Sequence, residues 1–130
     1  MLTEQLSLEP GGYYLGLYIG SISIKAALLD KSGALVHKAW LRHFGRPFAV
    51  VETALKEIIQ AFPADKIYAP VGTGTAAAEL SEILGGEAVG EIMALTLAAG
   101  LESPTPASLI DIGGEDTKVL WFSRENGKPA

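Results

Sequence analysis

The chain has 130 residues, enough for one compact domain, and 48% of them are apolar, enough to supply its core. A net charge of −5 argues against nucleic acid as a partner, because a nucleic-acid-binding surface needs clustered basic residues. The sequence has no cysteine, so a disulfide framework and thiolate metal ligands are excluded. The N-terminus lacks a signal-peptide pattern, and no apolar run approaches the roughly 20 residues of a membrane span. We therefore expect a cytoplasmic domain without membrane contact.

The first half of the chain reads as an antiparallel meander followed by a helix. Residues 1–12 end in a proline–glycine cluster and are expected to form a mobile lead-in. Tight turns join the predicted strands, which are Tyr13–Ile19, Ile22–Leu29 and Ala34–Arg42. Pro47 suits the first turn of a helix that continues to about Ala61, because apolar residues recur there at helical spacing.

The second half alternates short strands with helices. In order, the pattern predicts a strand at Lys66–Val71, a Gly72–Thr75 loop, a helix at Ala76–Leu84, a strand at Glu87–Val89 and a helix at Glu91–Ala99 that Gly100 ends. The order β-β-β-α-β-α-β-α predicts an α/β fold. We expect a first lobe over residues 13–103 and the beginning of a second lobe over residues 104–130, after a proline-containing linker.

Two glycine turns between apolar strands carry the residues suited to chemistry. In Leu109–Leu120 an apolar run reaches Asp111, two glycines reverse the chain, and Lys118 lies in the strand that leaves the turn. Glycine amides can point at phosphate oxygens, a carboxylate can hold Mg²⁺ through its waters, and a lysine can offset phosphate charge. An ordinary hairpin has the same pattern, but Tyr14–Lys25 repeats it with a Gly20–Ser21 bend. Two such turns favour two related lobes that clamp one nucleotide.

These turns resemble the phosphate-1 and phosphate-2 motifs of the actin, sugar kinase and Hsp70 ATPase superfamily. In particular they resemble the activator (activase) family of 2-hydroxyacyl-CoA dehydratases and benzoyl-CoA reductases, whose patterns are G-x-D-x-G-S-T-x-x-K and D-I-G-G-(Q/E)-D-(S/T)-K. Residues 111–118 match the second pattern throughout. Residues 16–25 match the first except that Tyr18 replaces the aspartate and Ile22 the threonine. The resemblance implies a ribonuclease H-like (actin-like ATPase) lobe followed by the first β-hairpin of a second lobe.

The resemblance also implies a function. The family binds and hydrolyses ATP with Mg²⁺ to drive electron transfer to a CoA-ester dehydratase or reductase, and its homodimers hold a [4Fe–4S] cluster. The cluster cysteine belongs to a segment that this sequence does not contain, so the chain looks like an N-terminal piece that is inactive alone. Asp111 and Asp116 are the implied catalytic residues, and Asp111 would hold Mg²⁺ through water. The implied ATP-binding residues are Gly20, Ser21, Lys25, Gly72, Gly74, Gly113, Gly114 and Lys118.

Other interpretations remain open. Tyr18 matters most, because a phenol cannot hold a hydrated metal at neutral pH as the family aspartate does. A degenerate, non-catalytic scaffold or regulatory lobe is therefore an alternative, and a sugar or acetate kinase-like enzyme is another. Gly72–Ala77 also fits a dinucleotide fingerprint, although an antiparallel meander precedes it. His37 and His43 stand without nearby acidic residues or cysteine and are interpreted as structural.

Overall fold

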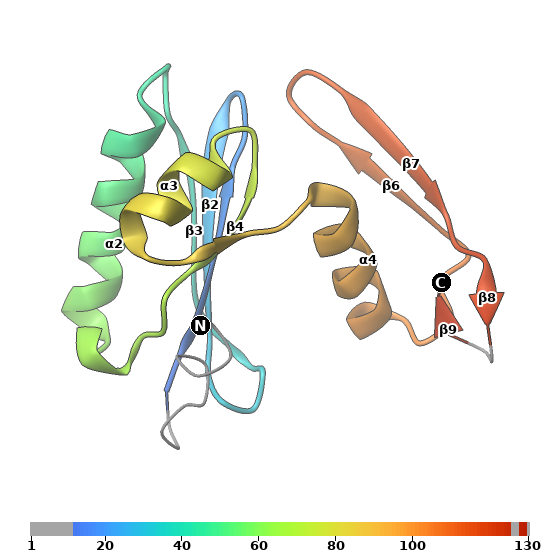
Figure 1. The fold of residues 1–130 in the computed structure, drawn as a ribbon, viewed down its shortest axis with the longest axis horizontal. Coiled ribbons are helices and arrows are strands. Elements are labelled where there is room, and N and C mark those ends of the chain that lie inside the picture. The colour runs from blue at the N-terminus through green and yellow to red at the C-terminus, as the bar shows by residue number, and fades with distance from the viewer. Residues whose placement is uncertain (1–11, 126–127, 130) are drawn as a thin grey trace. The chain divides into compact units, whose positions relative to one another are not determined.

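The computed structural model describes residues 12–125 and 128–129, so most of the predicted lead-in lies outside the described residues. The chain divides into two compact units, Met1–Ala88 and Val89–Ala130 (Figure 1). This division falls before the helix that the sequence analysis placed in the first lobe. The lobe boundary at residues 103–104 stays a prediction.

The first unit is built on a five-stranded mixed sheet. Its strands are β1 (Tyr14–Ile19), β2 (Ser23–Leu29), β3 (Leu35–Arg42), β4 (Val71–Gly74) and β5 (Glu87–Ala88). The order across the sheet is β3-β2-β1-β4-β5. Strands β1, β2 and β3 are antiparallel, whereas β4 is parallel to β1 and β5 is parallel to β4. The predicted meander is confirmed, and β4 beside β1, with β5 beyond it, gives the sheet its ribonuclease H-like order.

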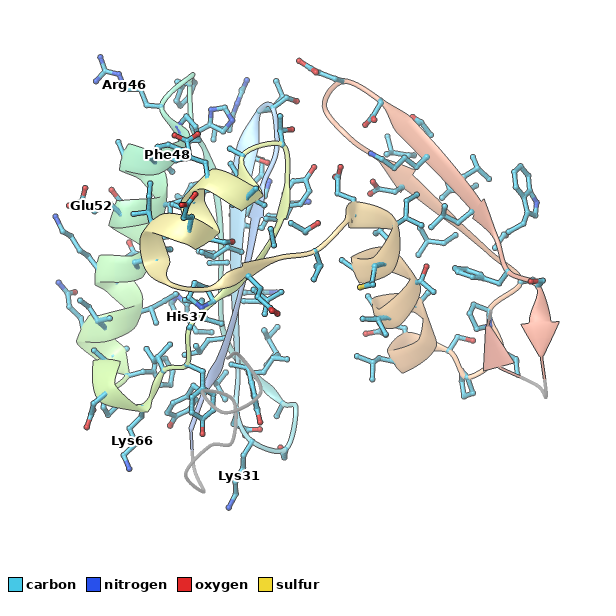
Figure 2. The ribbon with its side chains drawn as sticks, viewed as in Figure 1. Lys31, His37, Arg46, Phe48, Glu52 and Lys66 are labelled. Atoms are coloured by element: carbon cyan, nitrogen blue, oxygen red, sulfur yellow. The ribbon has the colours of Figure 1, made fainter. Side chains whose placement is uncertain are left out.

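Two helices cover one face of this sheet (Figure 1). They are α2 (Pro47–Ala61) and α3 (Ala77–Leu84), and a short 3-10 helix, η1 (Ala64–Lys66), follows α2. Alternate residues of β1 and β2 share the covered face because side chains alternate along a strand. The resulting core contains Leu15, Leu17, Ile19, Ile24, Ala26 and Leu28 from the strands and Val51, Ala54, Ile58, Ala77 and Leu80 from the helices. The polar side of α2 points away from the sheet and carries Glu52 (Figure 2).

The second unit contains a helix and short antiparallel hairpins. Its elements are α4 (Glu91–Glu102), β6 (Ser108–Ile112), β7 (Thr117–Trp121), β8 (Arg124–Glu125) and β9 (Lys128–Pro129). The β6–β7 register makes Asp111 the cross-strand partner of Lys118. These two residues are half-buried, whereas Ile110, Ile112 and Trp121, on the other face of the hairpin, are exposed.

The predicted element order β-β-β-α-β-α-β-α is confirmed, but one strand and one helix have bounds that were wrong by more than one residue, and most of the predicted Gly72–Thr75 loop is strand. The strand expected at Lys66–Val71 is β4 at Val71–Gly74, because extended pairing with β1 begins only at Val71 and Ile67 makes a single bridge to Tyr13. Helix α4 continues through Gly100, since one glycine only weakens a helix, and it ends before Pro104. No helix in the described ranges combines the length and apolar character that spanning a bilayer requires.

We predict that Ile58→Ala lowers the free energy of unfolding by about 2–5 kcal/mol, because the side chain is fully buried in the core between α2 and the sheet and its removal leaves a cavity. Ile59→Ala is the matched control, since its side chain is 51% exposed and should cost less than about 1 kcal/mol. Urea unfolding followed by circular dichroism measures both. Equal losses in the two variants would contradict the described packing of α2.

Candidate functional site

The carboxyl ends of β1 and β4 lie side by side at one edge of the sheet. The parallel register pairs Ile19 with Gly74, and the Thr75 N–H donates a hydrogen bond of 2.8 Å to the Ile19 carbonyl. The Gly20–Ser21 bend and the Gly74–Thr75 segment are thus brought together. Ligands of open α/β sheets bind beyond the carboxyl ends of the strands, so this edge is the first candidate site.

The two glycines of β4 are required for different reasons. Gly74 has φ +102°, and a Cβ there would lie 2.3 Å from the Ile19 carbonyl oxygen, so only glycine allows this backbone approach. Gly72 is buried inside the strand, and a Cβ there would lie 2.7 Å from Oγ of Ser81 on α3. Packing of α3 on β4 therefore accounts for Gly72. Its predicted phosphate contact stays a prediction, as does that of Gly74.

The Gly20–Ser21 bend is held from both ends by hydrogen bonds. The Gly20 N–H donates to the Ser23 carbonyl at 2.9 Å, and the His43 N–H donates to the Ile22 carbonyl at 3.0 Å. The His43 side chain, only 7% exposed, places Nε2 2.8 Å from the Gly20 carbonyl oxygen. The bend is therefore a closed backbone loop. His43 is predicted from the sequence to be structural, but no local sequence pattern indicates its contact with this bend.

An aromatic ring stands where the resembled motif has its aspartate. Tyr18 and Lys25 are cross-strand partners, and Nζ of Lys25 lies 5.0 Å from the centre of the Tyr18 ring, within cation–π range. A Cβ on Gly20 would lie 2.7 Å from the same ring, so Tyr18 also packs against the bend. In β4, opposite Tyr18, Thr73 has a buried hydroxyl without a hydrogen-bond partner in the described part of the chain. This edge of the sheet thus offers a lysine and glycine backbone but no carboxylate at position 18.

The second candidate turn is the β6–β7 hairpin. The Gly113 N–H donates to the Asp116 carbonyl at 2.8 Å and closes the turn, whose tip is exposed. Nζ of Lys118 lies 3.0 Å from the Asp116 carboxylate and 3.8 Å from that of Glu91, which opens α4. The hydrogen bond to Asp116 raises the pKa of Lys118 above its ordinary value, and the negative charges of Glu91 and Asp111 act in the same direction. Lys118 is therefore a cation at neutral pH, held in place beside the turn.

The described residues could supply only part of the ligands of a metal ion. Among residues 12–125 and 128–129, no group of three or more His, Cys, Asp or Glu side chains is arranged to hold a metal ion. Mg²⁺ usually keeps several waters and takes only one or two carboxylates together with phosphate oxygens. The single half-buried carboxylate of Asp111 at the turn fits that kind of hydrated site and does not fit a site made of protein ligands alone.

A separate hollow of about 350 Å³ opens at the other end of the parallel strands. Its lining is almost wholly apolar and consists of Leu15, Leu55, Ile58, Ile59, Ala64, Ile67, Tyr68, Ala69, Pro70 and Leu84. A catalytic pocket combines apolar walls with converging polar side chains, and Tyr68 is the one polar side chain in this lining. The hollow is therefore a gap in the packing around α2 and carries none of the predicted site residues.

No family model matches the chain. A curated relative, the uncharacterized protein MJ0004 of Methanocaldococcus jannaschii, is 34% identical over 119 residues, which is 88% of this chain and 44% of the relative. The structure is similar to component A of the (R)-2-hydroxyglutaryl-CoA dehydratase of Acidaminococcus fermentans, with a TM-score of 0.75 and 24% identity over 91% of this chain and 45% of that one. It is also similar to the activator of the 2-hydroxyisocaproyl-CoA dehydratase of Clostridium difficile, solved with bound ADPNP, with a TM-score of 0.67 and 23% identity over 90% of this chain and 43% of that one.

These similarities establish the fold. The chain has the actin-like ATPase fold, and its two solved neighbours, a dehydratase component and a dehydratase activator, match the family that the glycine motifs resemble. The chain spans less than half the length of the relative and of both solved structures. The sheet begins with an antiparallel meander and its glycine pair lies within β4, so the topology differs from the all-parallel opening of a dinucleotide-binding domain.

We predict that Gly74→Ala destabilises the first unit by about 1–3 kcal/mol or more, because alanine is strained at φ +102° and its Cβ would collide with the Ile19 carbonyl. Gly16→Ala is the control, since a Cβ there meets only the Ala27 carbonyl oxygen at 3.9 Å, an ordinary contact. Thermal unfolding compares the two variants. A Gly74→Ala protein as stable as the Gly16→Ala protein would show that β1 and β4 do not approach so closely.

Proposed function

We propose that this chain is the N-terminal, nucleotide-binding part of an ATP-dependent activator of a CoA-ester dehydratase or reductase. The observation that carries the proposal is the uninterrupted Asp111–Lys118 motif, folded as a glycine hairpin with Lys118 oriented by Asp116. Support comes from the actin-like ATPase fold and from its similarity to a dehydratase component and to a dehydratase activator, the latter solved with bound ADPNP.

In this proposal the glycine turns bind phosphate oxygens. Backbone N–H groups in an exposed turn form an anion-binding concavity, and a neighbouring ammonium group adds a positive charge. The β6–β7 turn would supply Gly113, Gly114 and Lys118. At the carboxyl end of β1 the contacts would come from Gly20, Ser21 and Lys25. Gly74 would add a contact from the neighbouring end of β4, and Gly72 would lie two residues earlier in that strand.

In this proposal the β6–β7 turn would hold the metal ion and its water. Asp111 would hold a hydrated Mg²⁺, which when bound offsets phosphate charge and orients a water for hydrolysis. Asp116 donates nothing to the phosphates, because an ionised carboxylate only accepts hydrogen bonds, and its part is to hold Lys118 in position at 3.0 Å. Both carboxylates are therefore proposed to act in the reaction, Asp111 at the metal and Asp116 through the lysine.

The wider reaction is proposed from the same resemblance. ATP hydrolysis would drive electron transfer to the partner dehydratase or reductase from a [4Fe–4S] cluster shared by a cytoplasmic homodimer. This chain contains no cysteine and so supplies no thiolate ligand to such a cluster. Its own contribution would be to bind the nucleotide and to supply Asp111 and Asp116 for its hydrolysis.

We predict that Asp111→Asn in the full-length protein abolishes Mg²⁺-dependent ATP hydrolysis while leaving the fold intact. The change keeps the shape of the side chain but removes the charge that would hold the hydrated metal. Phosphate release measures the turnover, and circular dichroism measures the fold. Asp65→Asn, an exposed change in η1, is the control and should keep full activity. Undiminished turnover by a normally folded Asp111→Asn protein would reject the role of Asp111.

The Tyr18 ring favours a second candidate, a degenerate lobe that serves as a scaffold or regulatory module. The ring lies against Gly20 and beneath Lys25, where it occupies the place of the motif aspartate and engages the lysine. If the lobe has lost its metal-binding function, restoring the aspartate should restore affinity for MgATP. If the activator proposal holds, Asp111 alone organises the metal and the restoration changes little.

Under the activator proposal, we predict that Tyr18→Asp changes the dissociation constant of MgATP for the full-length protein by less than about tenfold, which is about 1.4 kcal/mol. Calorimetry measures this constant. Tyr14→Asp is the matched control, because Tyr14 lies on the same face of β1 but away from the bend. A gain of more than tenfold that is specific to Tyr18→Asp would favour the degenerate lobe over the activator.

A further inference from the structure

His43 sits at the junction between β3 and α2 and reaches across to the Gly20–Ser21 bend. Its backbone N–H binds the Ile22 carbonyl at 3.0 Å, and its Nε2 lies 2.8 Å from the Gly20 carbonyl. One residue thus holds both ends of a three-residue bend. Because the side chain is 7% exposed, water competes little for these bonds.

The hydrogen bond at Nδ1 of His43 determines whether Nε2 carries a proton. Nδ1 of His43 lies 3.1 Å from the Gly45 N–H and accepts its hydrogen bond, so Nδ1 carries no proton. A neutral imidazole has one donor and one acceptor nitrogen, so the proton is on Nε2, which donates to Gly20. Histidine is the residue that satisfies both sides here, because its two nitrogens have opposite roles at a fixed separation.

The loop on the Nδ1 side is held in an unusual conformation. Phe44 has φ +47° although its side chain is 81% exposed, and Gly45 follows with φ +77°. A bulky residue in the left-handed region is strained, and an exposed ring gains little packing to offset the strain. The hydrogen bond from Gly45 to the imidazole, together with the 2.7 Å bond from the Arg46 N–H to the His43 carbonyl, holds this loop closed. Figure 2 shows Arg46 extending outward from this loop, just before α2.

The bend that His43 holds has an unused donor. The Gly20 N–H is bound to Ser23, but no acceptor is found for the Ser21 N–H among the described residues, and Ser21 is exposed. A backbone N–H that points out of a fixed loop can bind an anion only if the loop keeps its shape. The Gly20 carbonyl shares its peptide plane with the Ser21 N–H, so fixing this carbonyl fixes that N–H, and the bond to the Ile22 carbonyl fixes the peptide plane at the other end of the bend.

We propose that His43 is the positioning residue of the first phosphate-binding turn. It touches no ligand: the Nε2–H bond to Gly20 keeps the bend in the shape that presents the Ser21 N–H, and the Nδ1 bond anchors the imidazole to the loop before α2. This inference rests on the proposed nucleotide-binding function of the same turn.

Two substitutions separate the two bonds of the imidazole. The amide of His43→Gln can reach the position of Nε2 and donate to Gly20, whereas the shorter side chain of His43→Asn reaches only the position of Nδ1, where its oxygen can accept from Gly45. The 130-residue chain, labelled with ¹⁵N, is titrated with MgATP and separately with inorganic tripolyphosphate, and the amide signals of Gly20 and Ser21 are followed. We expect His43→Gln to bind within about threefold of the wild type and His43→Asn to bind about tenfold more weakly, the effect of losing one buried hydrogen bond.

The outcomes are distinct. If neither probe shifts these amides in the wild type, the phosphate role of the bend fails, and this inference fails with it. If the wild type responds and His43→Asn binds equally well, or if both variants weaken equally, His43 is only a packing residue and this inference alone is overturned. The ¹⁵N spectrum of the wild-type imidazole gives a further test that does not depend on the folding of a variant. A proton on Nδ1 in place of Nε2 would also overturn this inference.

Discussion

The close parallel pairing of β1 with β4 is the constraint on which the first unit depends. It brings the backbone of Gly74 so near the Ile19 carbonyl that no side chain fits between them. The same pairing sets the carboxyl ends of both strands at one edge, where the Thr75 N–H binds Ile19. The buried face of β1 is then available to α2 and α3, whose apolar residues complete the core. Core packing and the candidate site thus depend on the same strand pair.

The two glycine turns are held in different ways, which suits different tasks. Backbone hydrogen bonds and the neutral side chain of His43 hold the bend after β1. The shape of this bend therefore does not depend on nearby charge. The β6–β7 turn is surrounded by charge, with Lys118 between the carboxylates of Asp116 and Glu91. A lysine paired with carboxylates is oriented but partly neutralised, and an incoming phosphate would compete with them for it. Under the proposed function, the first turn would position the phosphates and the second would hold the metal and the transferred phosphate.

Tyr18 shows how one substitution can change a site without changing a fold. On β1 it occupies an ordinary outward-facing strand position, where a tyrosine is well tolerated, and its cation–π contact with Lys25 is a normal cross-strand pair. The sheet is unaffected because Leu17 and Ile19 form the buried face of this strand on either side of Tyr18. Tyr18 would therefore weaken the binding of the ligand and not the fold, since an aromatic ring stands where a carboxylate would face the metal. Fold similarity to the activators is consistent with either outcome.

The sequence by itself determined the element order, the extent of α2 and the two glycine turns, because alternation, helical periodicity and glycine placement are local properties that survive in a single chain. It also supported a resemblance through the unbroken motif of residues 111–118. Only the tertiary structure decided that β4 begins at Val71, that Gly72 packs under α3 while Gly74 meets β1, and that His43 holds the first bend. These facts depend on contacts between residues far apart in the chain, about which local patterns carry no information.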